Sequence, residues 1–362
     1  MGEQKQRLAE LLAELGRRCM YVSSRANIRY LTGFTGSAGH LLVTPDSATL
    51  FTDGRYRSQA RRQTSGVEVV ISDGDPQIAL ARGIAQQGLR RVEFEPYSLP
   101  YAVYRYLRDE LADCRLDPAR PLVEDLRMVK SPGEIEAIKA SVSLNSQVFD
   151  EVLERSSPDW SEARLAAELE FGMRRLGAEG AAFPTIVASG SHGALPHAEP
   201  RARPVQRGAL TVVDQGAILA GYCSDMTRMV AWGEPDATQL ALFRGVLEAQ
   251  AAAVDAVRPG VECRSVHRRA RQVLSKFTVA GVRLDNAFRH STGHGLGLEI
   301  HEQPRVAARQ ETLLREGMVI TVEPGAYLDG CAGARVEDVV VVTRQGCEVL
   351  TPTSRDLRVL AA

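Results

Sequence analysis

The sequence predicts an α+β chain with two domains: an α/β domain, followed by a domain of antiparallel strand pairs and helices. With 362 residues, the chain is longer than one typical domain, and two domains are the natural expectation. Helical and strand patterns alternate in the first third, which favours an α/β domain. Beyond it, strand patterns come in pairs with glycine in the connection, which is typical of adjacent antiparallel strands.

The first domain begins with an amphipathic helix, whose apolar residues follow helical spacing at Leu8, Leu11, Leu12 and Leu15. Strand patterns follow at 41–44, 48–53, 67–72 and 91–95, and helices are expected from Arg55, Pro76 and Tyr101. The stretch 116–134 contains three prolines and no clear periodicity, so we place the domain boundary there. The expected domains are residues 1–125 and 126–362.

A long helix opens the second domain, because Pro132 suits the first turn of a helix and an apolar stripe follows it. Further helices are expected at 161–176, 238–258 and 263–280. The strand pairs are 209–217 with 222–232, and 317–327 with 335–343. Their similar layout indicates a weak internal repeat.

The composition excludes several classes of function. Lys and Arg number 44 against 45 Asp and Glu, a balance that predicts no binding to nucleic acid or to an anionic membrane. No apolar run approaches the length of a membrane span, and acids interrupt the N-terminal segment, so it does not resemble a signal peptide. The six scattered cysteines favour free thiols in a reducing compartment, and we expect a cytoplasmic protein.

Four carboxylates occupy matching places in the two strand pairs. Asp214 closes the first strand of one pair and Asp225 lies on its partner. Glu323 and Glu337 have the same places in the other pair. Four converging acids would repel, and most would protonate unless cations held them ionised. Two divalent ions supply the four positive charges that this set needs.

Three of the seven histidines lie in the stretch 290–301, which reads HSTGHGLGLEIH. His294 is the best-placed histidine to complete a metal site, because its flanking glycines let the backbone approach closely and adopt unusual dihedrals. Oxygen ligands with one imidazole suit Mn, Co, Fe or Zn, which predicts a two-metal hydrolase centre. Taken alone, the stretch also fits a tight loop, and each acid also fits a turn, surface or capping residue.

Five segments, in this order, resemble the metal-site motifs of the pita-bread metallopeptidases: VVDQGA, GYCSDMTR, HSTGHGLGLEIHE, TVEPGAY and GARVEDVVVVT. This family includes methionyl aminopeptidase, aminopeptidase P and prolidase. The segment 27–60 resembles the N-terminal domain of its Xaa-Pro-specific branch. The resemblance implies a creatinase/prolidase-like α/β domain, then a pita-bread domain with a curved antiparallel sheet and helices on its outer face.

The resemblance also implies roles for individual residues. The metal ligands would be Asp214, Asp225, His294, Glu323 and Glu337. His197 would reach the substrate, His301 would stabilise the tetrahedral intermediate, and His290 would be a further active-site histidine. Arg335 shares a strand face with Glu337. It fits a surface ion pair, or a role in holding a ligand or a substrate carboxylate.

The activity that the resemblance implies is hydrolysis of the bond between an N-terminal residue and proline. A hydroxide bridging the two metals would attack the carbonyl, and Glu323 would transfer the proton. The substrates would be small peptides with proline at the second position. Manganese is the first choice of metal, with cobalt, zinc or iron as alternatives, and the assembly would be a homodimer.

Alternative functions stay open at this point. A dipeptidase is favoured over an aminopeptidase P, because the short N-terminal domain leaves no obvious groove for long peptides. A binding module that has lost its ligands and a metal-free creatinase-like amidinohydrolase both conflict with the complete ligand set. Two residues depart from the family pattern: Gln215 replaces an apolar residue, and Met229 stands where threonine is common.

Overall fold

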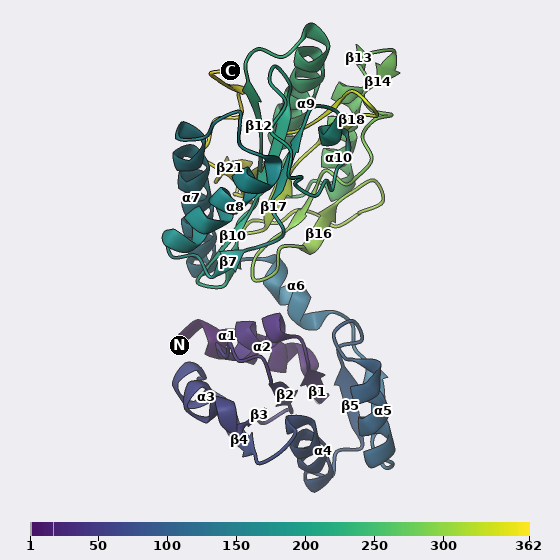
Figure 1. Cartoon of the computed structure of the whole chain (residues 1–362). Coiled ribbons are helices and arrows are strands. Elements are labelled where there is room, and N and C mark those ends of the chain that lie inside the picture. Colours follow the sequence, from purple (N-terminus) through teal and green to yellow (C-terminus); the bar gives the residue numbers. More distant parts are fainter. Residues whose placement is uncertain (1, 17) are drawn as a thin grey trace. The chain divides into compact units, whose positions relative to one another are not determined.

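The computed structural model describes residues 2–16 and 18–362 and divides the chain into two compact units, Met1–Arg127 and Met128–Ala362 (Figure 1). The division falls within helix α6 (Leu122–Met128). It lies inside the proline-containing stretch 116–134 of the sequence.

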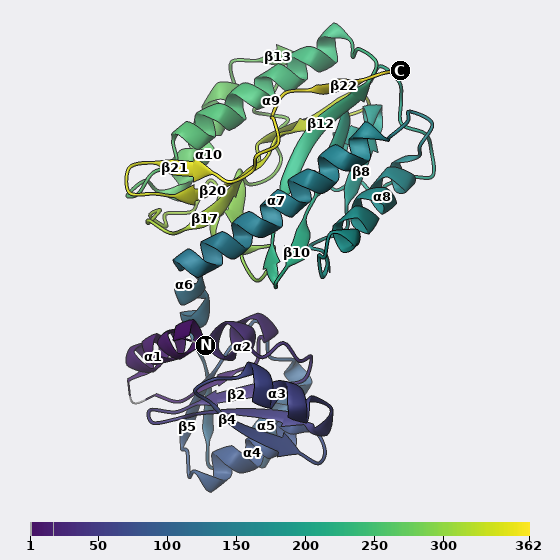
Figure 2. The same cartoon turned by 90° about the vertical axis from the view of Figure 1, so that its left-hand side faces the viewer.

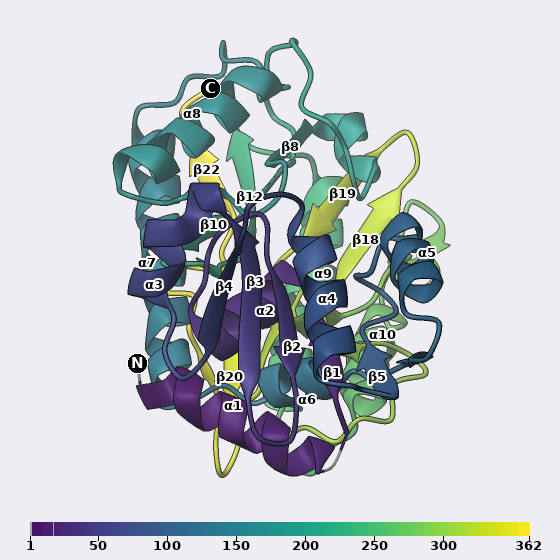
Figure 3. The same ribbon diagram turned by 90° about the horizontal axis from the view of Figure 1, so that it is seen from below.

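The first unit is a mixed sheet with helices, as the alternating patterns predict. The strands follow the order β4-β3-β2-β1-β5-β6, and Figure 3 shows β4, β3, β2 and β1 across the unit. Neighbours β3–β4, β1–β5 and β5–β6 are parallel, whereas β1–β2 and β2–β3 are antiparallel. The strands are β1 (Met20–Val22), β2 (His40–Val43), β3 (Ala48–Asp53), β4 (Glu68–Ser72), β5 (Arg91–Phe94) and β6 (Arg115–Pro118).

Two helices of this unit begin at clear sequence signals. Ser24 caps α2 and Asp75 caps α4, and Pro76 occupies the first turn of α4. The apolar face of α4 and the sheet enclose a core that includes Tyr21, Phe51 and Ile84. The helices are α1 (Gly2–Leu15), α2 (Arg25–Thr32), α3 (Arg57–Gln63), α4 (Pro76–Gln86) and α5 (Tyr101–Glu110).

The second unit is built on antiparallel strands with long helices packed against them, which confirms the predicted class. Figure 2 shows α7 lying across β10 and β12, and α9 running beside α10. Ser131 and Glu134 form a capping box at the start of α7. The helices are α7 (Pro132–Glu154), α8 (Glu162–Arg175), α9 (Ala237–Asp255) and α10 (Cys263–Leu274).

Two sheets carry the site. One has the order β22-β12-β9-β8 and the other β16-β15-β17-β20-β21. Their strands are β8 (Ile186–Ser189), β9 (Thr211–Gln215), β12 (Met226–Trp232), β22 (Arg358–Leu360), β15 (Gly293–Gly295), β16 (Glu302–Val306), β17 (Val319–Val322), β20 (Asp338–Val342) and β21 (Cys347–Val349).

The expected internal repeat takes the form of two strand–hairpin–strand units. Strand β9 pairs with β12, and the hairpin strands β10 (Ala217–Leu219) and β11 (Tyr222–Cys223) lie between them in sequence. Strand β17 pairs with β20 in the same way, around the hairpin of β18 (Gly325–Leu328) and β19 (Ala332–Arg335). Strand β7 (Gly180–Ala181) joins β10.

The prediction of a helix over 263–280 is wrong at its end. Helix α10 stops at Leu274, and β13 (Thr278–Val279) pairs with β14 (Val282–Arg283). Ala280 and Gly281 both have positive φ, 47° and 79°, which suits a tight hairpin turn. β-Branched residues before a glycine therefore favoured a hairpin over a further helical turn.

Candidate metal centre

The first strand–hairpin–strand unit presents Asp214 and Asp225. Asp214 lies on β9 opposite Thr227 of β12, and Asp225 directly precedes β12. Gln215 is the next residue on β9, so its side chain points to the other face of the sheet. There its amide donates to the carbonyl of Asn145 on α7 at 2.9 Å. Gln215, which departs from the family pattern, therefore contacts helix α7.

The second unit presents Glu323 and Glu337 at the matching places. Val322, the last residue of β17, is opposite Asp338, the first residue of β20. Glu323 and Glu337 adjoin this pair, and the Glu323 N–H donates to the Thr292 carbonyl at 2.7 Å. Strand β15 carries His294 alongside β17, with Gly295 opposite Ile320.

The glycines beside His294 are required by close packing. A Cβ atom added at Gly293 would lie 1.9 Å from the Thr321 carbonyl oxygen, and one at Gly295 would lie 2.2 Å from the Gln303 carbonyl oxygen. The expected close approach of the backbone is thus present. The expected unusual dihedrals are absent, since neither glycine is among the described residues with positive φ. The crowding of β15 between β16 and β17 explains both results.

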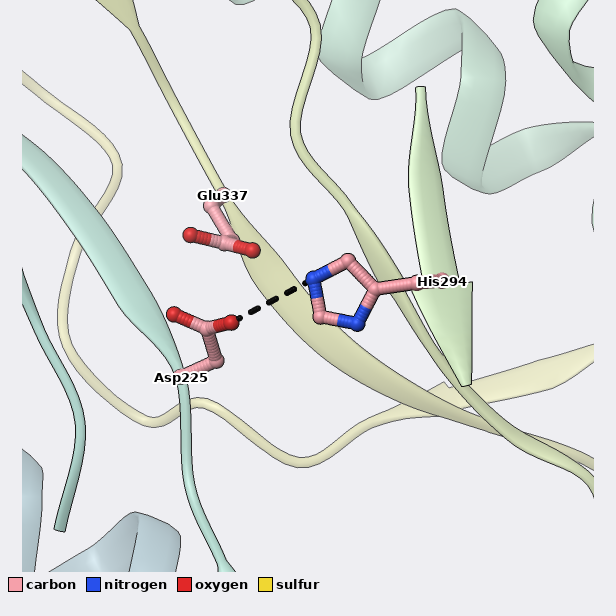
Figure 4. Close-up of side chains that lie close together, drawn as sticks. All are labelled: Asp225, His294 and Glu337. Carbon is pink, nitrogen blue, oxygen red and sulfur yellow. Dashed lines mark ion pairs between the residues drawn. The ribbon is translucent and has the colours of Figure 1, made fainter. Parts of the chain in front are cut away.

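Three side chains from three different segments of the chain converge. Ligand-type atoms of Asp225, His294 and Glu337 all lie within 4.8 Å of one another, and all three residues are buried (Figure 4). His294 Nε2 lies 3.5 Å from Asp225 Oδ2 and 3.7 Å from Glu323 Oε1. His294 Nδ1–H donates to the Gly295 carbonyl at 3.0 Å, which leaves the lone pair of Nε2 facing the acids.

The electrostatics of this pocket oppose four ionised acids. Burial raises the pKa of Asp225 well above its usual value, and neighbouring carboxylates, led by Glu337, raise it further. Burial also raises the pKa of Glu337 to about 8 and that of Glu323 well above its usual value. Burial lowers the pKa of His294 to about 4, so its imidazole is neutral at pH 7.

Two buried oxygens in this pocket have no hydrogen-bond donor among the described residues: Asp214 Oδ1 and Glu337 Oε1. Buried polar atoms normally have a partner, and a cation satisfies a carboxylate oxygen as a donor does. Together with a neutral imidazole, the donor set of the pocket fits divalent metal ions that prefer oxygen and nitrogen ligands.

Arg335 is buried beside the acids and makes four hydrogen bonds to protein atoms. Its Nη2 donates to Asp214 Oδ2 at 2.6 Å, and its Nε donates to Thr227 Oγ1 at 3.1 Å. Its Nη1 donates to Tyr327 Oη at 2.6 Å and to the Pro196 carbonyl at 3.2 Å. Thr227 in turn donates to Glu337 Oε2 at 2.8 Å. Arg335 thus orients the acids of both units.

The other predicted histidines lie around the same pocket. His290 Nε2 lies 2.9 Å from Tyr327 Oη, and burial lowers the pKa of His290 to about 3. The ring of His301 meets that of His294 edge-on, with centroids 4.4 Å apart. His197 is exposed, and its charge helps to lower the pKa of both His290 and His301, whose largest cause is burial.

Two participants were missed by the sequence analysis. Thr227 lies within the quoted segment GYCSDMTR, but its bonds to Arg335 and Glu337 join residues more than one hundred positions apart. Arg305 is exposed on β16, four residues past His301. Burial lowers the pKa of His301, and the positive charge of Arg305 lowers it further.

The sequence matches two protein families along its length. Residues 4–129 match the Creatinase/Prolidase N-terminal domain, and residues 136–344 match metallopeptidase family M24. The chain belongs to metallopeptidase family M24. The buried group of Asp225, His294 and Glu337 lies within the M24 region.

Relatives of this M24 chain match it over nearly its whole length. It is 32% identical to the Xaa-Pro dipeptidase of Pyrococcus horikoshii over 99% of both chains. A solved Xaa-Pro dipeptidase from Bacillus anthracis is 36% identical, with a TM-score of 0.93 over 99% of both chains. An X-Pro aminopeptidase from Thermotoga maritima is 35% identical, with a TM-score of 0.89 over 97% of this chain and 99% of that one.

These matches confirm the predicted fold, with a creatinase-type N-terminal domain before an M24 metallopeptidase domain.

The sequence predicts no membrane-spanning segment, and the helices of the structure can be compared with that expectation. None of those formed by residues 2–16 and 18–362 combines the length and apolar composition that a bilayer crossing requires.

Proposed function

We propose that this protein hydrolyses the peptide bond between an N-terminal residue and proline, with two divalent metal ions at the M24 centre. The convergence of Asp225, His294 and Glu337 within 4.8 Å, in a pocket where burial opposes the charges of the acids, carries the proposal. The names of the relatives from P. horikoshii and B. anthracis support the choice of substrate. The ions would be held by Asp214, Asp225, His294, Glu323 and Glu337.

The bound ions would activate a water molecule and polarise the scissile carbonyl. Glu323 is 3.7 Å from His294 Nε2 and would accept the proton of the attacking water, then pass it to the leaving nitrogen. His301 would donate a hydrogen bond to the oxyanion, and His197 would contact the substrate near the scissile bond. Proline lacks an N–H, so this substrate cannot be held by the amide donor that ordinary peptidases bind.

The role of Arg335 follows from its four contacts. Its hydrogen bonds to Asp214, Thr227, Tyr327 and the Pro196 carbonyl favour a positioning role over binding of a substrate carboxylate. Through Tyr327 it also supports His290, which would orient the substrate side of the pocket.

A dipeptidase needs a cation that recognises the free carboxylate of proline. Arg305 meets that requirement better than Arg335, because it is exposed and its positive charge lowers the pKa of His301 after burial. We therefore favour a dipeptidase. The similarity to the Thermotoga maritima X-Pro aminopeptidase supports the second candidate, an aminopeptidase acting on longer peptides.

One assay tests this proposal directly. The metal-free protein is reconstituted with Mn²⁺ or Co²⁺, and kcat/KM is compared for an Xaa-Pro dipeptide and an Xaa-Pro-Xaa tripeptide. We expect the dipeptide to be the better substrate. We also expect Arg305→Met to raise KM for the dipeptide more than for the tripeptide, with exposed Arg309→Met as the matched control. If neither peptide is cleaved, the substrate assignment is wrong.

The metal, the assembly and the compartment complete the proposal. We propose manganese as the preferred ion, because the pocket offers carboxylates and one imidazole and no thiolate among its converging ligands. A homodimer is proposed from the family resemblance, and a cytoplasmic location from the six scattered cysteines, which favour a reducing compartment. Metal analysis of protein purified without added metal and light scattering in solution check the first two.

A further inference from the structure

A buried carboxylate on α8 binds the segment that carries His197. Glu162 is 1% exposed, and its Oε1 accepts the Ser189 N–H at 2.9 Å. Its Oε2 accepts His192 Nδ1–H at 2.9 Å and the Arg201 N–H at 3.0 Å. The Arg201 guanidinium donates to both oxygens, at 3.1 and 3.2 Å. One side chain thus fixes the segment 189–201 near its beginning and at its end.

We propose that Glu162 is a positioning residue that sets the place of His197, an inference that rests on the substrate-side role proposed for His197. The ring of His197 is exposed and makes no hydrogen bond with the described residues. Its position therefore follows from the backbone that carries it. That backbone runs between His192 and Arg201, the two residues that Glu162 holds.

Strand β19, which carries Arg335, holds the same segment on its other side. A Cβ atom added at Gly333 of β19 would lie 1.9 Å from the Gly193 carbonyl oxygen, so the two backbones touch there. Arg335, also on β19, donates to the carbonyl of Pro196, the residue before His197. The segment is therefore clamped between the Glu162 carboxylate and the strand that orients Asp214.

Capping of helix α8 does not require Glu162. Ser161 is the N-cap residue, and its hydroxyl already accepts the Arg164 N–H at 3.0 Å. The carboxylate of Glu162 is instead used entirely by residues of the 189–201 segment. Charge-assisted hydrogen bonds of this kind are about twice as strong as neutral ones. They hold the segment rather than the helix.

Two substitutions weaken this clamp to different degrees. Glu162→Gln places an amide donor against N–H groups that need an acceptor. Arg201→Met removes only the two guanidinium bonds from a side chain that is 44% exposed, so it is the milder change. Glu168→Gln is the matched control, because Glu168 lies on the same helix and pairs with Arg155 at 2.8 Å, away from the segment.

The first measurement is hydrogen exchange of the amides of residues 189–201, which needs no substrate. Both clamp variants are expected to exchange faster there than the wild type and Glu168→Gln, while the amides of β17 and β20 keep their protection. Unchanged protection in Glu162→Gln would overturn the proposal, whether or not the protein cleaves Xaa-Pro peptides.

The second measurement is a double-mutant cycle with His197→Ala, at constant metal content. We expect each clamp variant to lower kcat/KM roughly 10- to 100-fold in the wild-type background. In the His197→Ala background the same change should cost no more than about twofold. If the fold losses in kcat/KM of the two single variants multiply in the double variant, Glu162 acts independently of His197. That result would refute the inference.

Discussion

Each unit of the protein buries carboxylates, and the two sites balance the charge by different means. Glu95 in the first unit is 5% exposed, as is Asp225 in the second. Glu95 accepts the N–H groups of Ser23 and Ser24, both at 2.7 Å, and the Asn27 amide at 2.6 Å. The neighbours of Asp225 are mostly other acids.

The difference shows what each site is suited for. The donors around Glu95 offset part of the cost of burial, although burial still raises the pKa of Glu95 above its usual value. In the second unit, Glu337 Oε1 and Asp214 Oδ1 have no donor among the described residues. A carboxylate surrounded by N–H groups is part of the fold, whereas a cluster of acids with buried oxygens that no donor reaches is suited to bind cations.

The largest expected effect comes from neutralising an acid of the metal pocket. Asp225→Asn or Glu337→Gln should lower kcat/KM roughly 1,000-fold or more, because several kcal/mol of metal-dependent stabilisation is lost. Without metal, the same variants should be more stable than the wild type at pH 7, because a buried amide is neutral without taking up a proton, whereas the raised pKa of the buried acid is a cost to folding. Metal binding and urea denaturation check both parts, with exposed Asp329→Asn as control.

A smaller effect is expected from the residue behind the acids. Arg335→Met removes the donor of Asp214 Oδ2 and the support of Thr227 and Tyr327. Such supporting residues typically change metal affinity or activity 10- to 100-fold, and we expect a loss of about that size in metal affinity. Calorimetric titration with Mn²⁺ measures it. An unchanged Mn²⁺ affinity would show that Arg335 does not support the metal-binding acids.

The smallest effect on activity is expected in the first unit. Glu95→Gln turns an amide donor toward backbone N–H groups and should destabilise this unit by about 2 kcal/mol. Metal affinity should not change. Hydrogen exchange of residues 20–32 measures the local loss of stability. A change in metal content would mean that the two carboxylate sites are not independent.

Local patterns were enough to predict much of the fold. Pro132 and the apolar stripe after it located the start of α7, and paired strand patterns with glycine in the connection located the pairs β9–β12 and β17–β20. The helix predicted to run to residue 280 was wrong, because the turn at Ala280 and Gly281 competed with the helical pattern. Turn chemistry decided the structure where two patterns overlapped.

The site was predictable to the extent that its residues lie on regular strands or directly beside their ends. Asp225, His294 and Glu337 do converge, as the strand positions of the acids suggested. The contacts of Arg335 with Asp214 and Thr227 join residues 121 and 108 positions apart, and no local pattern carries such information. Arg305 could have been noticed only from its spacing of four residues from His301.

The central claim is that the acids of the pocket are stable together only with cations, and stability against pH tests it most directly. Both tryptophans, Trp160 and Trp232, lie in the second unit, so their fluorescence follows its unfolding in urea. The pKa of Glu337 is raised from 4.5 to about 8. Between pH 4.5 and about 8, the folded protein therefore keeps a proton on Glu337 that the unfolded chain has released.

Between about pH 7.5 and 8.5, across the folded pKa of Glu337, the metal-free protein should lose stability as the pH rises, since the histidines, with an ordinary pKa of 6.5, are by then largely neutral in both states. With Mn²⁺ bound, this loss should disappear, because the metal replaces the protons. Asp225→Asn and Glu337→Gln should weaken the pH dependence. A metal-free protein whose stability stays constant or increases over this range, with no response to Mn²⁺, would contradict the account.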